Sequence, residues 1–181
     1  FVNMIKKINL LFLIFLMIGK IKYAPGTIAS LVTCFLFLIL TNFFNISFIF
    51  LITLIIILYS FIAINNFFKE FDSDDPPEIV IDEVIGQMIT LIAIPVYETL
   101  YPLPVIYYCI SAFILFRIFD IWKPYPVNYI DNNIKGALGI ILDDIVASFY
   151  SILILCVIFF FLGAWFNEII KQEYSQKVNK K

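Results

Sequence analysis

The sequence has no histidine, only three cysteines and a single arginine. Cys34, Cys109 and Cys156 are scattered, and each lies inside an apolar run, so we expect neither a zinc site nor a disulfide framework. Any metal site must then use oxygen ligands, which favours Mg²⁺, Mn²⁺ or Ca²⁺. The net charge of −2 and the lack of a basic patch argue against nucleic acid as a partner.

Charge is also scarce, because 14% of the 181 residues are charged while 62% are hydrophobic, and the mean hydropathy is +1.00. Three stretches carry no charge at all, between Lys22 and Lys69, between Glu98 and Arg117, and between Asp144 and Glu168. About 20 apolar residues span a bilayer as a helix, so these stretches predict membrane-spanning helices. A soluble bundle is disfavoured, since so short a chain cannot bury so many apolar side chains.

We therefore predict an all-α, polytopic membrane bundle with short or re-entrant helices, forming one domain over residues 1–181. The expected spans are residues 28–40, 46–64, 84–96 leading on to 104–119, and 145–166. The third consists of two short helices with a proline-rich turn between them. Residues 8–19 are too few for a span and no cleavage site follows them, so an interfacial or re-entrant helix is expected. A lysine-rich tail occupies about residues 168–181.

Alternation of these helices across the bilayer places three polar segments, residues 20–27, 65–83 and 120–144, on one side. Those segments hold Lys20, Lys22, Lys69, Lys123 and Lys135, whereas the loops on the other side hold no lysine or arginine. The positive-inside rule makes the lysine-bearing side cytoplasmic. The same count puts the C-terminal tail, with four lysines, on the opposite side, so its location stays open.

The first polar block on that side is residues 24–30. Pro25 and Gly26 interrupt the chain before a helix, and we expect Thr27 to cap that helix. The free N–H groups at a helix start suit a phosphate, and Ser30 lies one turn further on. A simple helix cap would give the same pattern.

The second block is Asp82-Glu83-Val84-Ile85-Gly86-Gln87. Asp82 and Glu83 stand where an apolar helix begins, and carboxylates there are stabilised by the helix dipole. Gly86 would let a partner helix or a ligand approach closely. The acids of the preceding loop, residues 72–78, are expected to be a solvated surface run.

The third block runs from Phe116 to Pro126 and contains Arg117, Asp120 and Lys123. Arg117 and Asp120 are about one helical turn apart on one face, and Pro124 predicts that the helix ends near Lys123. A lone arginine at the end of an apolar run needs a partner or a function. Its guanidinium group can bind phosphate in a bidentate manner, whereas lysine acts as a mobile point charge.

The fourth block is residues 136–147, in which Asp143 and Asp144 open the uncharged run that ends at Glu168. Two adjacent carboxylates repel each other unless a cation or a proton lies between them. Each block alone is consistent with an interfacial helix end. Together they place five acids (Asp82, Glu83, Asp120, Asp143 and Asp144), one arginine and one lysine on one side, which predicts a site for a hard cation and an anionic phosphate.

In this order and spacing, the blocks resemble the phosphatidylglycerophosphatase A family over about residues 19–148. The resemblance rests on Ala24-Pro25-Gly26-Thr27, Ile81-Asp82-Glu83-Val84-Ile85-Gly86-Gln87, Phe116-Arg117-Ile118-Phe119-Asp120-Ile121-Trp122-Lys123-Pro124-Tyr125-Pro126 and Gly139-Ile140-Ile141-Leu142-Asp143-Asp144-Ile145-Val146-Ala147. It implies a bacterial inner-membrane, Mg²⁺-dependent lipid phosphatase that converts phosphatidylglycerophosphate to phosphatidylglycerol. Ala29 and Ala137 depart from a common glycine, but both are small.

The resemblance also implies roles. The five acids would be the catalytic and Mg²⁺-binding set, and Arg117, Lys123, Thr27 and Ser30 would bind the substrate phosphate. With no histidine and no obvious cysteine nucleophile, direct attack by water is the first expectation and an aspartyl-phosphate the second. Which carboxylate acts as base stays open, as does the oligomeric state.

Two other classes of protein use similar residues. A CDP-alcohol phosphotransferase or a prenyl-transferring enzyme also binds Mg²⁺ with aspartates on helices, but it would bring a second aspartate cluster that this chain lacks after Asp143-Asp144. A small transporter would use buried acids as an ion path. It would not need Arg117, Lys123 and the Pro-Gly-Thr turn on one surface.

Overall fold

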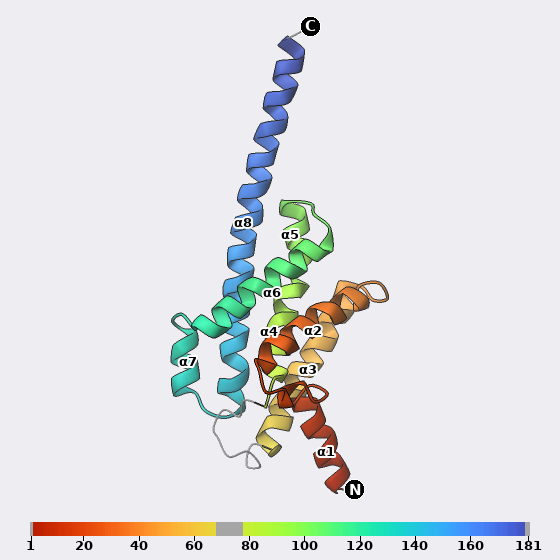
Figure 1. The fold of residues 1–181 in the computed structure, drawn as a ribbon, viewed down its shortest axis with the longest axis vertical. Coiled ribbons are helices and arrows are strands. Elements are labelled where there is room, and N and C mark those ends of the chain that lie inside the picture. The colour runs from red at the N-terminus through yellow and green to blue at the C-terminus, as the bar shows by residue number, and fades with distance from the viewer. Residues whose placement is uncertain (1, 68–77, 180–181) are drawn as a thin grey trace.

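The chain forms a bundle of helices, seen here in a computed structural model that describes residues 2–67 and 78–179 (Figure 1). No strand occurs in that part of the chain, so the prediction of an all-α fold is confirmed. The elements are α1 (Val2–Leu13), η1 (Ile18–Lys20), α2 (Pro25–Leu40), α3 (Ile46–Phe67), α4 (Ile81–Ile92), α5 (Ile94–Leu100), α6 (Val105–Trp122), α7 (Val127–Asn133) and α8 (Ala137–Asn179).

Four helical segments among the described residues are long and apolar enough to cross a membrane. They are Ile46–Asn66, Ile81–Leu100, Val105–Trp122 and Ala137–Gln172, and Pro25–Leu40 is an apolar helix of shorter length. These segments match the predicted spans to within a few residues, except at α8. The expectation of a helical membrane protein is therefore confirmed.

The predicted turn between the two helices of the third span is shorter than expected. Helix α5 fills most of it, and only residues 101–104 connect α5 to α6. Pro95 lies at the second position of α5, where its missing N–H would have had no partner within the helix. Proline here begins a helix rather than ending one.

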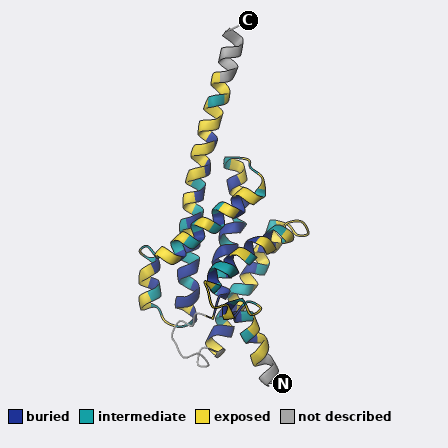
Figure 2. Ribbon diagram, viewed as in Figure 1, coloured by how far each residue is buried: buried dark blue, intermediate teal, exposed yellow. Residues whose placement is uncertain are grey.

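Helix α4 is the centre of the bundle. Half of the apolar segment that α4 and α5 form together is buried, whereas the other three spans are 22% to 28% buried and show most of their apolar surface to the outside. Exposed apolar side chains on outer helices are expected where the surroundings are lipid. The buried residues accordingly concentrate where α4 meets α6 and the first half of α8 (Figure 2).

Gly86 allows this close packing of α4. A β-carbon built at Gly86 would lie 2.5 Å from the Phe116 ring of α6 and 2.9 Å from the backbone oxygen of Asp144 in α8. Both distances are too short for a real side chain. The prediction that Gly86 admits a close partner is confirmed, and the partners are two helices that carry polar blocks.

Helix α8 begins earlier than predicted, at Ala137 instead of residue 145, so Asp143 and Asp144 lie inside it rather than at its start. Its 43 residues extend about 64 Å at 1.5 Å per residue, roughly twice the ~30 Å of a bilayer core. Figure 1 shows α8 running from the bundle past α5, with its C-terminal end far from α1. The tail, as far as residue 179, thus lies at the opposite end of the molecule from the polar blocks.

The N-terminal helix is too short to span a membrane. Helix α1 has 12 residues and is followed by a tight turn in which Phe15, Leu16 and Met17 have positive φ, before η1. An interfacial or re-entrant position for α1 stays a prediction. Lys69 and the acids Asp72, Asp74 and Asp75 lie outside the described residues, whereas Glu78 is described and exposed, as expected of that loop.

Candidate active site

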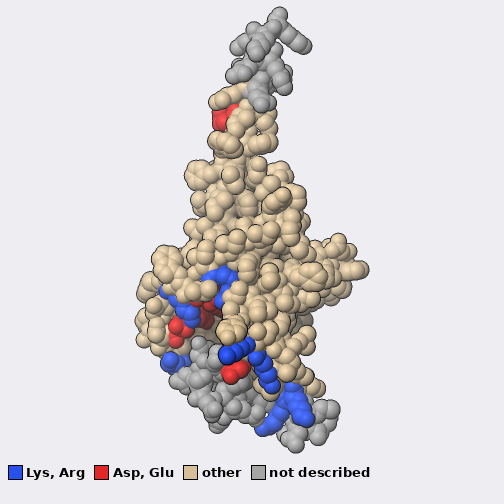
Figure 3. Space-filling view, in the orientation of Figure 1, with Lys and Arg blue, Asp and Glu red and all other residues tan. Residues whose placement is uncertain are grey.

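The four polar blocks meet at one end of the bundle. A cavity of about 350 Å³ is lined by the starts of α2 and α4, the end of α6, part of α7 and the first turns of α8. Figure 3 shows most of the visible charged side chains gathered on this half of the molecule. The cavity's charged lining residues are Asp82, Glu83, Arg117, Asp120, Lys123, Asp131, Lys135, Asp143 and Asp144. All five predicted acids, Arg117 and Lys123 are therefore brought together.

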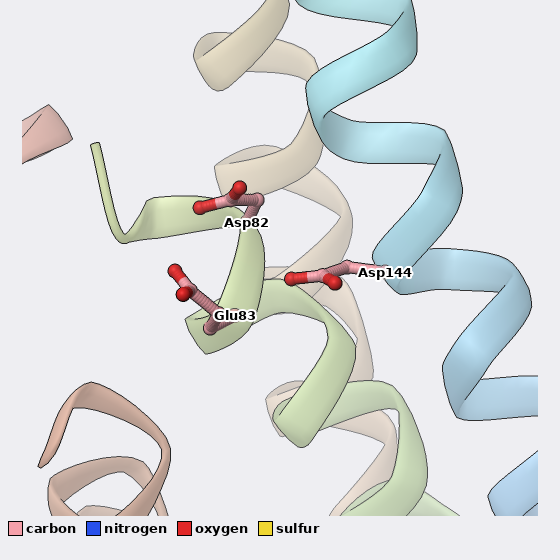
Figure 4. Close-up of side chains that lie close together, drawn as sticks. All are labelled: Asp82, Glu83 and Asp144. Carbon is pink, nitrogen blue, oxygen red and sulfur yellow. The ribbon is translucent and has the colours of Figure 1, made fainter. Parts of the chain in front are cut away.

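Three of the acids converge, and among the described residues no basic side chain donates a hydrogen bond to any of them. Carboxylate oxygens of Asp82, Glu83 and Asp144 lie within 4.8 Å of one another. Figure 4 shows Asp144 reaching from α8 toward the first turn of α4, which carries Asp82 and Glu83. One oxygen of each group is buried and accepts no hydrogen bond from the described residues. Such a cluster is costly to bury unless a cation or protons neutralise it.

The other two acids are paired with bases. Arg117 donates a hydrogen bond to Asp120 on the same face of α6, and its Nη1 lies 3.8 Å from Glu83 Oε1. Lys123 Nζ donates to Asp143 Oδ2 at 2.8 Å. The five predicted acids thus form two groups. Asp82, Glu83 and Asp144 form a cluster, whereas Asp120 and Asp143 each accept a hydrogen bond from a base. The buried Nε–H of Arg117 has no acceptor in the described part of the chain, so this donor is available to a ligand.

Lys123 ends α6, as Pro124 predicts, and its backbone adopts the left-handed conformation of a helix C-cap (φ 46°). Its ammonium group lies between two carboxylates, because it also donates to Asp131 Oδ1 at 2.5 Å. Burial by itself would lower the pKa of Lys123, but the hydrogen bonds to Asp131 and Asp143 outweigh burial and raise that pKa above its ordinary value. Lys123 is therefore a permanent cation that joins α6, α7 and α8.

The start of α2 differs from the prediction. The helix begins at Pro25 with Ala24 as its cap, and Thr27 lies within the first turn, so the expectation that Thr27 caps the helix is wrong. Proline fits the first helical position because its φ is already helical. Thr27 still lines the cavity. Ser30 does not line it, and its hydroxyl donates to the Gly26 carbonyl at 3.0 Å.

Gly26 brings α2 against the acids of α4. A β-carbon at Gly26 would lie 1.7 Å from Glu83 Oε1, so only glycine leaves room for that carboxylate. The first N–H groups of a helix have no partner within it. The start of α2 therefore faces the acidic cluster with its backbone exposed to the cavity.

Two charged residues of the cavity were not predicted as site residues. Asp131 is carried by α7, a helix of seven residues, and Lys135 follows α7 at the cavity edge. Their position in the sequence could have identified them as site residues, since both lie between Lys123 and Asp143 on the predicted cytoplasmic side. Six acids against three bases leave the cavity with a formal excess of three negative charges. A cation bound in such a cavity would favour the entry of an anionic ligand.

The fold and the cavity define a helical membrane protein with a carboxylate-rich site at one end. The family described as Phosphatidylglycerophosphatase A matches residues 11–176. The chain belongs to this family of lipid phosphatases. It is therefore an enzyme that hydrolyses a phosphomonoester. The match favours this class over the CDP-alcohol phosphotransferase, prenyl-transferring enzyme and transporter hypotheses.

Curated relatives agree on the class of reaction. A "Phosphatidylglycerophosphatase A" of Haemophilus influenzae is 32% identical over 86% of this chain and 94% of its own length. Another of the same name, from Escherichia coli, is 40% identical over 46% of this chain and 44% of its own length. A protein of Bacteroides thetaiotaomicron named "Putative phosphatidylinositol-3-phosphatase" is 34% identical over 80% of this chain and 89% of its own length. No solved structure matches the chain.

Proposed function

We propose that this enzyme removes the terminal phosphate of phosphatidylglycerophosphate, giving phosphatidylglycerol and inorganic phosphate, and that it requires Mg²⁺. The observation that carries the proposal is the cluster of Asp82, Glu83 and Asp144, which accepts no hydrogen bond from a basic side chain of the described residues and shares one cavity with Arg117 and the start of α2. The family supports the reaction, and the names of two relatives support the substrate.

The acidic cluster fits a hard divalent cation. One oxygen of each carboxylate is buried without a hydrogen-bond donor among the described residues, the three groups lie close together, and the chain offers no imidazole. Asp82, Glu83 and Asp144 would hold the ion, with Asp120 and Asp143 beside them. Bound there, Mg²⁺ would neutralise phosphate charge and lower the pKa of a bound water.

Arg117 is the candidate phosphate clamp. Its guanidinium group is fixed by Asp120 on one side, and its buried Nε–H is left for a phosphate oxygen. The backbone at the start of α2, with Thr27, would contact other oxygens. In the reaction a water oxygen bonds to phosphorus, the bond from phosphorus to the glycerol oxygen breaks, and that oxygen takes a proton to become the alcohol. A carboxylate of the cluster would accept the proton of the attacking water.

The site would face the cytoplasm from the bacterial inner membrane. The lysines of the described loops at this end support that orientation. Labelling of single added cysteines with a membrane-impermeant maleimide tests it, because native Cys34 and Cys109 are buried and half-buried Cys156 lies within the apolar segment of α8. We expect Lys22→Cys to react only in inverted vesicles and Asn42→Cys, in the loop after α2, only in right-side-out vesicles. The reverse pattern would place the site outside.

The name of the Bacteroides relative supplies a second candidate substrate, phosphatidylinositol 3-phosphate. Both lipids carry a phosphomonoester on a polar headgroup, so the cluster and the clamp could serve either. Phosphate release by the purified enzyme should be measured on both lipids in the same detergent with Mg²⁺. We expect a higher kcat/KM on phosphatidylglycerophosphate, and faster turnover of the inositol lipid would replace the proposed substrate.

A further inference from the structure

A second, apolar depression lies between α2 and α6. Its volume is about 680 Å³, and none of its lining side chains carries a charge, an oxygen or a nitrogen. Helix α2 contributes Leu31, Phe35 and Leu38, and α6 contributes Ile106, Ile110 and Ile114. We call it the α2–α6 groove.

The groove is elongated along the two helices. On each helix its lining residues recur three or four positions apart, so they form a stripe on one face. The stripe on α2 rises about 10 Å from Leu31 to Leu38 at 1.5 Å per residue. Two such stripes side by side leave a channel suited to an extended hydrocarbon chain rather than to a round ligand.

The groove begins where the active-site cavity ends. Thr27 lines the cavity, and Leu31, one turn later on α2, lines the groove. On α6, which runs the other way, Ile114 lines the groove and Arg117 lines the cavity. The path along α2 from Thr27 to Leu38 rises about 16 Å, close to half of the ~30 Å hydrocarbon core of a bilayer.

We propose that the α2–α6 groove holds one acyl chain of the lipid whose phosphate occupies the cavity, a proposal that rests on the proposed function. A molecule that fits both sites must be anionic at one end and hydrocarbon at the other, and it must be about one leaflet long. A transmembrane helix of a partner or of a second copy would match the apolar stripe but not the polar cavity that continues it. The groove would orient the lipid so that its phosphate ester faces Arg117.

Tryptophan substitutions would shorten the groove at chosen depths. Ile106→Trp fills its far end, and Leu31→Trp fills the end next to the cavity. Both positions are exposed to the outside, so the added ring can be accommodated without disturbing the buried core. Leu36→Trp is the matched control, because Leu36 is exposed on the same helix α2 but does not line the groove.

Kinetics should be measured on phosphatidylglycerophosphate with hexadecanoyl chains and with hexanoyl chains. We expect Ile106→Trp to raise KM about fivefold or more for the long-chain lipid and less than about twofold for the short-chain lipid, which does not reach that depth. Leu31→Trp should raise KM for both lipids, and Leu36→Trp for neither. Equal kinetics of all three variants on the long-chain lipid would overturn the groove as an acyl site.

A covalent probe gives a readout that does not depend on turnover. Phosphatidylglycerophosphate with a diazirine at the end of one acyl chain should label peptides of α2 and α6, and excess unlabelled substrate should suppress that labelling. Phosphatidylcholine with the same chain is the control for ordinary bilayer contact. Equal labelling by both lipids, or cross-linked dimers of Ile110→Cys without lipid adducts, would overturn the proposal.

The two proposals can fail separately. If the wild-type enzyme releases no phosphate from phosphatidylglycerophosphate, the proposed function fails, while the headgroup-selective labelling still decides whether the groove binds a phosphate-bearing lipid. If it releases phosphate but the groove variants match Leu36→Trp on both chain lengths, only the acyl site fails.

Discussion

Gly26 lies directly against Glu83, because a β-carbon at Gly26 would come within 1.7 Å of the Glu83 Oε1 atom. The start of α2, which offers free N–H groups, and the start of α4, which offers two carboxylates, therefore meet with no side chain between them. In the proposed reaction this contact holds the phosphate-binding backbone beside the cation-binding acids.

Gly26→Ala tests that contact. The added methyl group must displace the Glu83 carboxylate or the first turn of α2, so we expect kcat to fall about tenfold or more. Gly163→Ala is a matched control at the far end of the bundle, where a β-carbon would lie 2.3 Å from the Leu100 backbone oxygen. It should lower Tm without lowering turnover per folded molecule. Normal turnover of Gly26→Ala would show that the contact is not needed.

Asp144→Asn tests the acidic cluster as a cation site. A divalent ion present at about 100 times its Kd should stabilise the wild-type protein by roughly 2.7 kcal/mol, which is about 5–10 °C in Tm. Asp144→Asn should lose most of this gain. Without the ion it should melt no earlier than wild type, since one of three repelling carboxylates is removed.

The matched control for that measurement is Glu168→Gln, which removes an exposed carboxylate near the other end of α8. It should keep the full thermal response to Mg²⁺. An undiminished response in Asp144→Asn would mean that the ion binds elsewhere.

Arg117→Lys separates the phosphate clamp from a structural ion pair. Lysine keeps the charge but loses the planar fork and the Nε–H, so a bidentate phosphate contact should not survive. Loss of about 3 kcal/mol of transition-state stabilisation would cut kcat by roughly two powers of ten. Phosphate release per folded molecule is measured together with a melting curve. A variant that melts earlier but turns over normally would make Arg117 structural and leave the phosphate to Lys123 and Thr27.

Lys123 should contribute stability over the whole neutral range. Its pKa is raised in the folded state, so its contribution is fully present below the unfolded pKa of about 10.4 and is lost only as the pH rises through the folded value. Lys123→Met should therefore lower Tm by a constant amount between about pH 7.5 and about pH 9, where Lys123 and its partners keep their charges.

Lys20→Met, at an exposed position, is the control for Lys123→Met and should change Tm much less. A Tm deficit of Lys123→Met that disappears within that pH range would contradict the raised pKa of Lys123.

Local rules predicted the ends of several elements. Pro124 placed the end of α6 at Lys123, and Asp82 with Glu83 marked the first turn of α4. Counting apolar helices across a bilayer was enough to bring the four polar blocks to one end. These predictions succeeded because they depend only on neighbouring residues and on the number of apolar helices, and both can be read from the sequence.

What the sequence could not predict depends on contacts between helices. Helix α7 is held by buried Val127 and Ile130, two apolar residues in a polar segment too short to show a period. The salt bridge from Asp131 to Lys123, and the division of five acids into a cluster and two ion pairs, follow from how α4, α6 and α8 pack. The early start of α8 at Ala137 depends on Gly139, whose missing side chain admits the Ile134 carbonyl: a β-carbon would lie 1.9 Å from that oxygen.

The central claim is that the acids of α4 and α8 hold the cation on which phosphate release depends. The direct test is the rate of phosphate release from phosphatidylglycerophosphate by the purified enzyme after exhaustive chelation, followed by titration with Mg²⁺. Carboxylate ligands without imidazole predict that chelation abolishes release, that Mg²⁺ restores it, and that Asp144→Asn needs far more Mg²⁺ or is not restored. Full activity of the chelated wild-type enzyme would contradict the account.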